Sequence, residues 1–396
     1  MRVAIIGQGY VGLTIAVGAA GAGHKVIGFD VNDELVEQLN SGISHIEGIS
    51  DSQLNGFVAN GAYKASTQPS VLNVSDVVVI AVPTPLTEAR NPDLSFVHAA
   101  VELIQNNVKT PTLVINESTS YPGTLRKEIA GRISGIDHLY ASSPERVDPG
   151  NTQWGTKNTP RLIGGLTPEA VAKAKEFYSS FCDTVIEVSS PEVAEAAKIF
   201  ENTFRQVNIA LVNEFAQIAD ALGISGREVL DAAATKPYGF MEFNPGPGVG
   251  GHCIPVDPTY LAYIANEVGV PATFIKRANE VNLAMPAYVV KRVVAGAGRS
   301  VKGKSVVVVG VSYKANVADT RETPAASIID LLREAGAIVN WHDPLVPTWR
   351  GESSSALGAS DVAVVVTKHE VVSIADIKKS SYVFDCTGSI PGADGI

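Results

Sequence analysis

The chain contains few cysteines and no long apolar run. Of its 396 residues, only three are cysteine: Cys182, Cys253 and Cys386. They lie far apart and form no CxxC pair, so their spacing excludes a disulfide framework and a cysteine-based zinc site. Unpaired thiols are typical of a reducing compartment, and we expect the protein to be cytoplasmic. Nothing in the sequence approaches 18 consecutive apolar residues, so no membrane-spanning helix is predicted.

Basic charge is also scarce. The chain has 31 lysines and arginines against 41 aspartates and glutamates, which gives a net charge of -10. Nucleic acids and membrane surfaces favour a basic face, so we expect neither as a partner. The hydrophobic fraction of 45% is that of an ordinary globular protein. A chain of this length exceeds a single core, so two or three domains are expected.

The N-terminal segment has the pattern of a dinucleotide-binding unit. An apolar strand at 2–7 leads into Gly7-x-Gly9-x-x-Gly12, a small-residue helix to about 21 follows, and a second strand at 24–30 ends in Asp30. Such glycines permit the tight turn, approach of the pyrophosphate, and packing of helix on strand. The terminal acid suits a ribose hydroxyl and repels a 2′-phosphate, which favours NAD over NADP. The alternative is a glycine-rich turn without a ligand.

Further strands are predicted at 77–82, 113–116 and 139–141, alternating with helices. Beyond them, residues 192–220 contain neither glycine nor proline, which predicts one unusually long helix. Phe200, Phe204, Val207 and Leu211 share a face of this helix at helical spacing. We therefore expect a helix that bridges two domains and supports a homodimer.

From residue 304 the opening pattern returns in a degenerate form. The segments 305–310, 337–343 and 359–367 repeat the pattern of the first sheet, but the turn after 310 lacks the second and third glycines. Lys314 and Arg321 follow it, so side-chain cations would replace backbone N–H groups as phosphate ligands. The predicted fold is α/β, with two Rossmann-like doubly wound parallel sheets joined by a helical central domain. We expect domains at 1–190 (NAD-binding), 191–295 (central, helical, dimerising and catalytic) and 296–396 (binding the second nucleotide).

The segment 244–257 brings one thiol, Cys253, behind four glycines and two prolines. Glycine and proline disfavour helix and strand interiors, so we predict a shaped loop over the whole segment. A thiol together with NAD suggests oxidation of a carbon to the acid level through a thioester. The alternative is a small buried residue, the usual state of a free cysteine and the one expected for Cys182 and Cys386. His252 is expected to be a loop residue with a structural hydrogen bond.

Polar residues near predicted strand ends and on the long helix complete the candidate site. Lys198 and Asn202 are four residues apart and share a helix face. Glu145 and Thr119 follow predicted strands, where parallel sheets bind ligands. A solvated helix face and a solvated loop acid are the alternatives for the first pair and for Glu145.

These segments together resemble the UDP-glucose/GDP-mannose dehydrogenase family over essentially the whole chain. The motifs that carry the resemblance are GxGYVG at 7–12, Val-Pro-Thr-Pro at 82–85, Ser-Pro-Glu-Arg at 143–146, Lys198-x-x-x-Asn202, Gly-Gly-His-Cys at 250–253 with Asp257, and Tyr313-Lys314 before 319–324. The resemblance implies a cytoplasmic NAD-dependent 6-dehydrogenase that oxidises a UDP-sugar twice. It implies no metal site.

The resemblance also implies roles for individual residues. Cys253 would be the nucleophile, while Lys198, Asn202 and Asp257 would support the oxyanion and the water. Glu145 and Thr119 would serve acid–base and water-positioning roles. The implied cofactor-binding residues are Gly7, Gly9, Tyr10, Val11, Gly12, Asp30, Pro83, Thr84, Thr119 and Arg321. The implied substrate-binding residues are Glu145, Arg146, Val147, Lys198, Asn202, Arg205, Tyr238, Phe240, Gly250 and Lys314.

The loop sequences look most like bacterial UDP-N-acetylglucosamine 6-dehydrogenases, so UDP-N-acetylglucosamine is the expected substrate. UDP-glucose, UDP-N-acetylmannosamine and GDP-mannose are alternatives with the same mechanism. A single-step hydroxyacid dehydrogenase would need neither the thiol nor the second sheet. A non-catalytic NAD-binding regulator is the alternative from another functional class.

Overall fold

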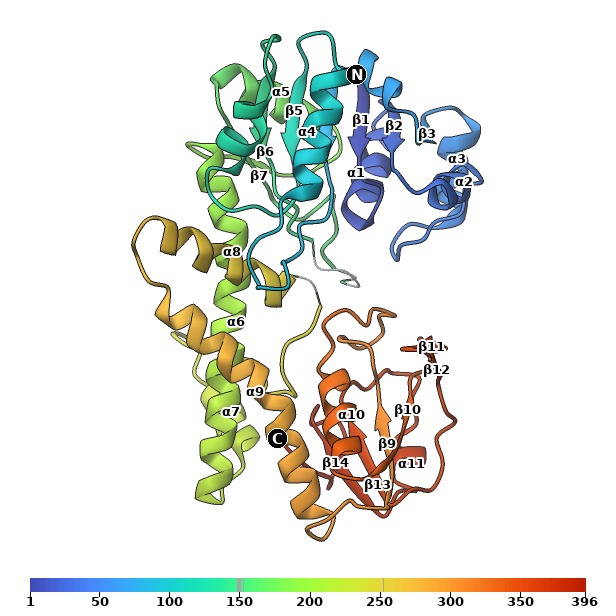
Figure 1. Cartoon of the computed structure of the whole chain (residues 1–396), viewed down its shortest axis with the longest axis vertical. Helices are drawn as coiled ribbons and strands as arrows, with labels where there is room; N and C mark the ends of the chain where they lie inside the picture. The colour runs from blue at the N-terminus through green and yellow to red at the C-terminus, as the bar shows by residue number, and fades with distance from the viewer. Residues whose placement is uncertain (148–150, 152, 252) are drawn as a thin grey trace. The chain divides into compact units, whose positions relative to one another are not determined.

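The computed structural model describes residues 1–147, 151, 153–251 and 253–396. The chain divides into two compact units. The first comprises residues 1–201 and 259–268, and the second comprises 202–258 and 269–396. The helix α6 (Pro191–Leu222) begins in the first unit and ends in the second (Figure 1). The division into three domains stays a prediction.

The first unit is built on an eight-stranded sheet in the order β3-β2-β1-β4-β5-β6-β7-β8. Its strands are β1 (Arg2–Ile6), β2 (Lys25–Phe29), β3 (Tyr63–Ser66), β4 (Val77–Ile80), β5 (Leu113–Asn116), β6 (Leu139–Ser142), β7 (Arg161–Gly165) and β8 (Val185–Glu187). The strands from β3 to β6 are parallel, as predicted, but β7 runs antiparallel to β6. β7 and β8 were not predicted, because β7 begins with Arg161 and ends in two glycines, and β8 has only three residues and ends in Glu187.

Helices of the first unit connect these strands. They are α1 (Tyr10–Gly21), α2 (Asp33–Asn40), α3 (Asp51–Ala59), α4 (Ser95–Asn107) and α5 (Pro168–Ser179), with short helical turns at Pro69–Val74, Leu125–Ile129 and Ala130–Arg132. All four residues of β4 and of β5 are buried. Strands buried on both faces are typical of a sheet covered by helices on both sides. Because the strands themselves are buried, the polar candidate residues Thr84 and Thr119 lie in the loops that follow the carboxyl ends of β4 and β5.

The second unit contains a five-stranded parallel sheet in the order β10-β9-β13-β14-β15. Its strands are β9 (Ser305–Val309), β10 (Ile338–His342), β13 (Val362–Val365), β14 (Tyr382–Asp385) and β15 (Asp394–Gly395), beside a small hairpin of β11 (Thr348–Trp349) and β12 (Glu352–Ser353). Its helices, besides the end of α6 and the start of α8 (Cys253–Glu267), are α7 (Gly226–Ala234), α9 (Thr273–Gly296), α10 (Pro324–Glu334) and α11 (Ile374–Ile377) (Figure 1). The predicted second sheet is confirmed.

Apolar side chains of α9 join the core of the second sheet. Val289 and Val293 pack in one cluster with Val306 and Val308 of β9. On the earlier turns of α9, Asn282 accepts a hydrogen bond from Asn213 of α6 at 2.9 Å. The helix α9 therefore packs against both the sheet and α6 within the second unit.

Candidate functional site

The turn between β1 and α1 has the geometry of a pyrophosphate cradle. Gly7 has φ +91°, and a Cβ there would lie 2.4 Å from the carbonyl oxygen of Ala81. A Cβ at Gly12 would lie 1.9 Å from the carbonyl oxygen of Gly7, so only glycine lets α1 pack on β1. A Cβ at Gly9 would meet nothing within 4 Å. The turn therefore leaves open space beside Gly9, at the N-terminus of α1, as a dinucleotide phosphate requires.

Asp30 follows β2 directly. Its carboxylate accepts hydrogen bonds from the backbone N–H of Gln8 at 2.8 Å and of Asn32 at 3.1 Å. Beside it, a hollow of about 630 Å³ is lined by residues that include Phe29, Val31 and Thr67. The residues present therefore fit an NAD molecule with its ribose at Asp30 and its pyrophosphate at Gly9.

The loops after β4 and β5 are tied together by Ser118. Its hydroxyl donates to the carbonyl oxygen of Val82 and accepts from the N–H of Val82, both at 2.9 Å. This brings the loop of Thr84 next to that of Thr119, and both threonines are buried. Pro83 is exposed. The predicted Val-Pro-Thr-Pro motif and Thr119 are therefore neighbours at one edge of the sheet.

Glu195 on α6 anchors the loop that carries Thr119. Its carboxylate accepts from the N–H groups of Gly123 and Leu125, at 2.7 and 2.8 Å. It also accepts from the Ser120 hydroxyl at 3.4 Å. Burial raises the pKa of Glu195 to about 7, against these stabilising donors. No sequence pattern indicates this role, because the partners of Glu195 lie about 70 residues away in the chain.

Glu145 lies in the loop after β6 and is buried. Its carboxylate accepts from the N–H groups of Arg146 and Val147 at 2.7 and 2.9 Å, and from Arg161 at 2.8 Å. Lys198 of α6 donates from Nζ to the main-chain oxygen of Glu145 at 2.6 Å. The structure therefore brings the predicted Glu145 and Lys198 together, and it excludes a solvated loop acid at 145.

Arg146 was predicted to bind substrate. In this structure its guanidinium contacts Glu201 of α6, with Nη2 and Nε at 2.6 and 3.1 Å from the two carboxylate oxygens. Its Nη1 donates to the carbonyl oxygen of Pro160 at 2.8 Å. These bonds fasten the loop after β6 to α6.

Cys253 is exposed and is the first residue of α8 (Cys253–Glu267). The prediction of a loop from 244 to 257 is therefore wrong for its last five residues, although 244–251 do form a loop. Pro255 is compatible with the helix because the first-turn N–H groups have no intrahelical acceptor. A helix N-terminus favours the thiolate over the thiol. His252 lies outside the described residues.

Asp257 follows Cys253 by four residues, one turn along α8. It is fully buried, and its carboxylate accepts from Nδ2 of Asn202 at 2.6 Å. Two predicted catalytic residues, far apart in sequence, are therefore in contact within the second unit.

The glycines before the thiol pack against protein. A Cβ at Gly250 would lie 2.7 Å from Cβ of Tyr313, and one at Gly251 would lie 2.8 Å from the same ring. The N–H of Gly251 donates to the carbonyl oxygen of Arg321 at 2.9 Å. These glycines are therefore required for the thiol loop to lie against Tyr313 and the loop of Arg321.

Arg321 is held by Asp319, whose carboxylate lies 2.5 Å from Nη2 and 3.0 Å from Nε. This contact raises the pKa of Arg321, and the charge of Cys253 acts in the same direction. The next residue, Glu322, has φ +49°, a left-handed conformation that non-glycine residues rarely adopt. The predicted cation is therefore part of a constrained loop that also contacts the thiol loop. Lys314 is half-buried in the same unit.

The other two cysteines behave as expected. Cys182 and Cys386 are buried, and burial raises the pKa of Cys182 to about 11 and that of Cys386 further. Neither is a nucleophile in this state.

Of the remaining predicted substrate residues, Arg205, Tyr238 and Phe240 are exposed in the second unit.

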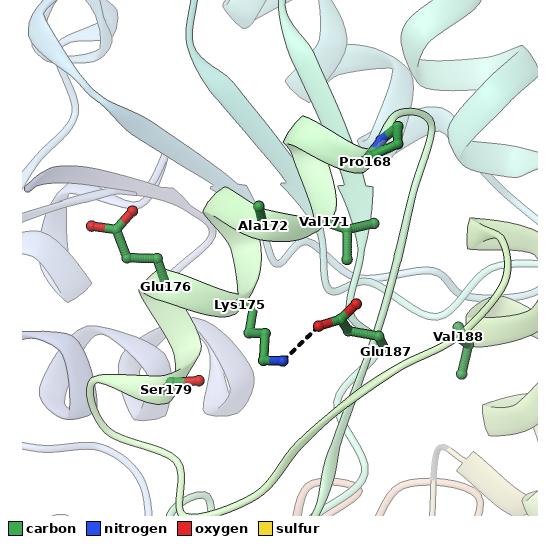
Figure 2. Close-up of a pocket in the computed structure, with 8 residues that line it drawn as sticks. All are labelled: Pro168, Val171, Ala172, Lys175, Glu176, Ser179, Glu187 and Val188. Atoms are coloured by element: carbon green, nitrogen blue, oxygen red, sulfur yellow. Dashed lines mark hydrogen bonds and ion pairs between the residues drawn. The ribbon is translucent and has the colours of Figure 1, made fainter.

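A separate pocket of about 470 Å³ lies against α5 (Figure 2). Lys175 and Glu187 form an ion pair of 2.6 Å across it. None of the predicted site residues lines it, so it is not part of the candidate site.

Over the described ranges, no group of histidine, cysteine and acidic side chains is arranged to hold a metal ion. Within the same ranges, no helix combines the length and apolarity needed to span a bilayer.

Comparison with known families accounts for nearly the whole chain. Residues 1–182 match the NAD-binding domain, 192–284 the central domain, and 307–390 the UDP-binding domain of the UDP-glucose/GDP-mannose dehydrogenase family. The chain belongs to this family. It is therefore an NAD-dependent oxidoreductase that acts on nucleotide sugars, as the motifs predicted.

Individual relatives refine the comparison. A UDP-N-acetyl-D-mannosamine dehydrogenase of Pyrococcus horikoshii is 34% identical over 379 residues, covering 93% of this chain and 90% of the relative. An NDP-N-acetyl-D-galactosaminuronic acid dehydrogenase of Ralstonia nicotianae is 34% identical, covering 93% and 90%. The structure of UDP-D-ManNAc dehydrogenase from Pyrococcus horikoshii superposes with a TM-score of 0.89 and 32% identity, covering 100% and 99%. The expected UDP-N-acetylglucosamine group is not named among these relatives.

Proposed function

We propose that this enzyme oxidises the C6 alcohol of a UDP-N-acetylhexosamine to the uronic acid, with UDP-N-acetylmannosamine as the first candidate. The names of the similar proteins support an acetamido sugar and favour N-acetylmannosamine over the N-acetylglucosamine that the loop motifs suggested. The observation that carries the proposal is Cys253, an exposed thiol at the first residue of a helix, whereas the other two cysteines are buried.

The protein groups have separable tasks in this proposal. The Gly7–Gly12 turn and Asp30 hold NAD, which when bound accepts the hydride at each oxidation. After the first oxidation, the Cys253 thiolate adds to the C6 aldehyde and forms a thiohemiacetal. The second oxidation gives a thioester, and water hydrolyses it to the acid and the free thiol. Each sugar therefore yields two NADH.

Charge develops on the C6 oxygen when the thiolate adds. Lys198 and Asn202, one turn apart on α6, are the proposed donors to this oxyanion. Loss of one such donor lowers the rate by on the order of 10²–10³-fold. The proton of the attacking water must be accepted during hydrolysis, and Glu145, Asp257 and Thr119 are the proposed residues for orienting that water.

A substrate screen tests the proposal directly. NADH is counted for UDP-ManNAc, UDP-GlcNAc, UDP-GalNAc, UDP-glucose and GDP-mannose. The proposal expects two NADH per sugar and the highest kcat/KM for UDP-ManNAc. One NADH per sugar would favour a single-step dehydrogenase, and a higher kcat/KM for UDP-GlcNAc would restore the sequence-based substrate.

Cys253→Ser tests the covalent route. The serine variant should stall after oxidation or at a poorly hydrolysed ester, while its NAD affinity stays unchanged. Full turnover by this variant would exclude the thioester. Rapid alkylation of wild-type Cys253 by iodoacetamide, blocked by a UDP-sugar, would exclude a non-catalytic regulator in which the thiol is incidental.

We also propose that the protein is a cytoplasmic homodimer. Phe200, Phe204 and Leu211 of α6 are 62%, 41% and 65% exposed, which is unusual for large apolar side chains and is typical of an interface. Val207, predicted for the same face, instead packs beside Ala210 and Val281. Analytical ultracentrifugation of wild type and Leu211→Glu tests this, and a monomeric wild type would contradict it.

A further inference from the structure

Arg161, the first residue of β7, is 4% exposed and lies among three other segments of the first unit. Its Nη1 lies 2.7 Å from each carboxylate oxygen of Glu117, and its Nη2 lies 2.8 Å from Oε2 of Glu145. The ring of Tyr178 on α5 stacks 4.6 Å from the guanidinium carbon, and its hydroxyl donates to Glu117. One buried guanidinium therefore serves two buried carboxylates.

Two buried carboxylates share one guanidinium, and the charge of Lys198 lowers the pKa of Glu145, so Glu117 is the less compensated of the two. Burial raises the pKa of Glu117 to about 7, and the charge of Glu145 acts in the same direction. Burial also acts on Glu145, but the charge of Arg161, the Val147 N–H and the charge of Lys198 outweigh it, so the pKa of Glu145 is lowered. At neutral pH, Glu117 therefore takes up a proton in preference to Glu145.

The remaining titratable groups in contact with Arg161 are neutral. Burial raises the pKa of Tyr178 well above its ordinary value, and burial raises that of Cys182 to about 11. Neither competes for the charge of Arg161 near neutral pH. The ionised state of Glu145 therefore depends on Arg161 and Lys198.

The same contacts fix the position of Glu145. One of its carboxylate oxygens accepts from two backbone N–H groups and the other from Arg161, while its main-chain oxygen accepts from Lys198 at 2.6 Å. A carboxylate with donors on both oxygens is held in one orientation. Loss of Arg161 would therefore remove the donor to Oε2 and loosen the orientation of the carboxylate, while the backbone N–H groups and Lys198 still hold the loop.

We propose that Arg161 is a positioning residue that keeps Glu145 ionised and oriented for hydrolysis of the thioester. This inference rests on the proposed function, in which a base assists the attacking water. The water oxygen bonds to the thioester carbon, its proton passes to the Glu145 carboxylate, and the C–S bond breaks to release the Cys253 thiolate. Glu117 takes no part in proton transfer to substrate and serves to hold Arg161.

Arg161→Lys is the main test, because a lysine ammonium cannot reproduce the planar two-sided contact of the guanidinium. At pH 7 we expect kcat to fall about 10- to 100-fold, with KM for NAD unchanged. Intact-protein mass spectrometry should show an acyl adduct on Cys253 accumulating during turnover. The acid limb of the kcat–pH profile should move to higher pH, because Glu145 then has to lose its proton without the guanidinium.

Two further variants separate positioning from a merely structural role. Arg132→Lys changes an exposed arginine paired with Glu128 in the same unit and should leave the profile unchanged. Glu117→Gln leaves the guanidinium to Glu145 alone, so the acid limb should not move upward and no adduct should accumulate. If Arg161→Lys does not fold, the double variant Glu117→Gln/Arg161→Lys replaces it, because one ammonium then faces one carboxylate. The double variant should show the same fall in kcat, the same adduct on Cys253 and the same upward move of the acid limb.

The outcomes separate this inference from the proposed function. A wild-type enzyme that forms one NADH and no thioester would overturn the proposed function itself. A wild type with two NADH, together with an Arg161→Lys variant that loses activity equally at every pH without an adduct, would overturn only the role of Arg161. Equal upward shifts in Arg161→Lys and Glu117→Gln would overturn it as well.

Discussion

The two nucleotide-type sheets share a plan but use it differently. Gly7 and Gly310 both have positive φ, and a Cβ at either would clash with a carbonyl oxygen of the adjoining strand end. Each second strand ends before an aspartate, Asp30 in one sheet and Asp343 in the other. A glycine after the first strand and an aspartate after the second therefore occur in both sheets, and these two residues alone do not indicate a dinucleotide site.

The difference lies in what each acid contacts. The half-buried Asp30 accepts hydrogen bonds from two backbone N–H groups and lies beside the hollow lined by Phe29 and Val31. Asp343 is 1% exposed and accepts from Val311, Ser312 and His369. The Asp343 carboxylate already accepts hydrogen bonds from buried protein groups, so it is not available to a ribose hydroxyl as Asp30 is. Nucleotide choice is therefore set by the turns, while the sheets provide only the frame.

The largest effect is expected at Gly12. Gly12→Ala would place a Cβ 1.9 Å from the Gly7 carbonyl oxygen, so we expect the free energy of unfolding to fall by about 3 kcal/mol or more. Gly9→Ala is the matched control in the same turn, with open space around the new Cβ. Its stability should change by less than about 0.5 kcal/mol, while NAD affinity falls about tenfold. Chemical denaturation and NAD titration measure both, and similar stabilities for the two variants would contradict the account.

The matched substitutions Asp343→Asn and Asp30→Asn sharpen the comparison between the sheets. Asp343→Asn removes the charge from a buried contact with His369 and should lower the free energy of unfolding by about 3 kcal/mol, with NAD affinity unchanged. Asp30→Asn should weaken NAD binding about 10- to 100-fold with a smaller loss of stability. Calorimetric NAD titration and denaturation of both variants test this. Loss of NAD affinity in Asp343→Asn would show that the acids are not distinct in role.

The stability contributed by Asp343 should depend on pH. Burial opposes its charge, but the hydrogen bonds from His369 and the Ser312 and Leu345 N–H groups outweigh burial and lower its pKa. Its contribution is therefore fully present above the ordinary value of 3.8 and is lost as the pH falls through the folded-state pKa. The stability gap between wild type and Asp343→Asn should be equal at pH 7 and pH 5 and should narrow below about pH 4. A gap that narrows between pH 7 and pH 5 would contradict this assignment.

The smallest effect is expected from Lys314, the proposed cation for the nucleotide of the second sheet. Lys314→Met should raise the KM for the UDP-sugar about tenfold and leave the KM for NAD unchanged. Lys302→Met, an exposed lysine of the same unit, is the control. Steady-state kinetics in both substrates suffice, and an effect on the KM for NAD alone would move Lys314 to the cofactor site.

Sequence patterns predicted the parts of the fold that depend on local hydrophobic periodicity. The long helix was expected over 192–220 and is observed at Pro191–Leu222, and the strand expected at 113–116 is β5. The start of α8 at Cys253 was missed, because glycine and proline gave a loop signal that continued into the helix. The family motifs supplied most candidate site residues.

Contacts between distant residues could not be predicted in this way. Arg161 would be expected on the surface from its charge, yet it is buried against Glu117, which lies 44 residues away. Glu195 likewise carries no pattern that connects it to the loop of Thr119. Buried charges are stabilised by partners from other segments, so their roles emerge only when the segments are placed in three dimensions.

The covalent intermediate is tested most directly by single-turnover reaction with UDP-ManNAc, acid quenching and mass spectrometry of the peptide that contains Cys253. The account predicts a transient adduct of the sugar nucleotide on this thiol, which forms with NADH and decays as the uronic acid appears. Two NADH per sugar with no adduct on Cys253 at any quench time would contradict it.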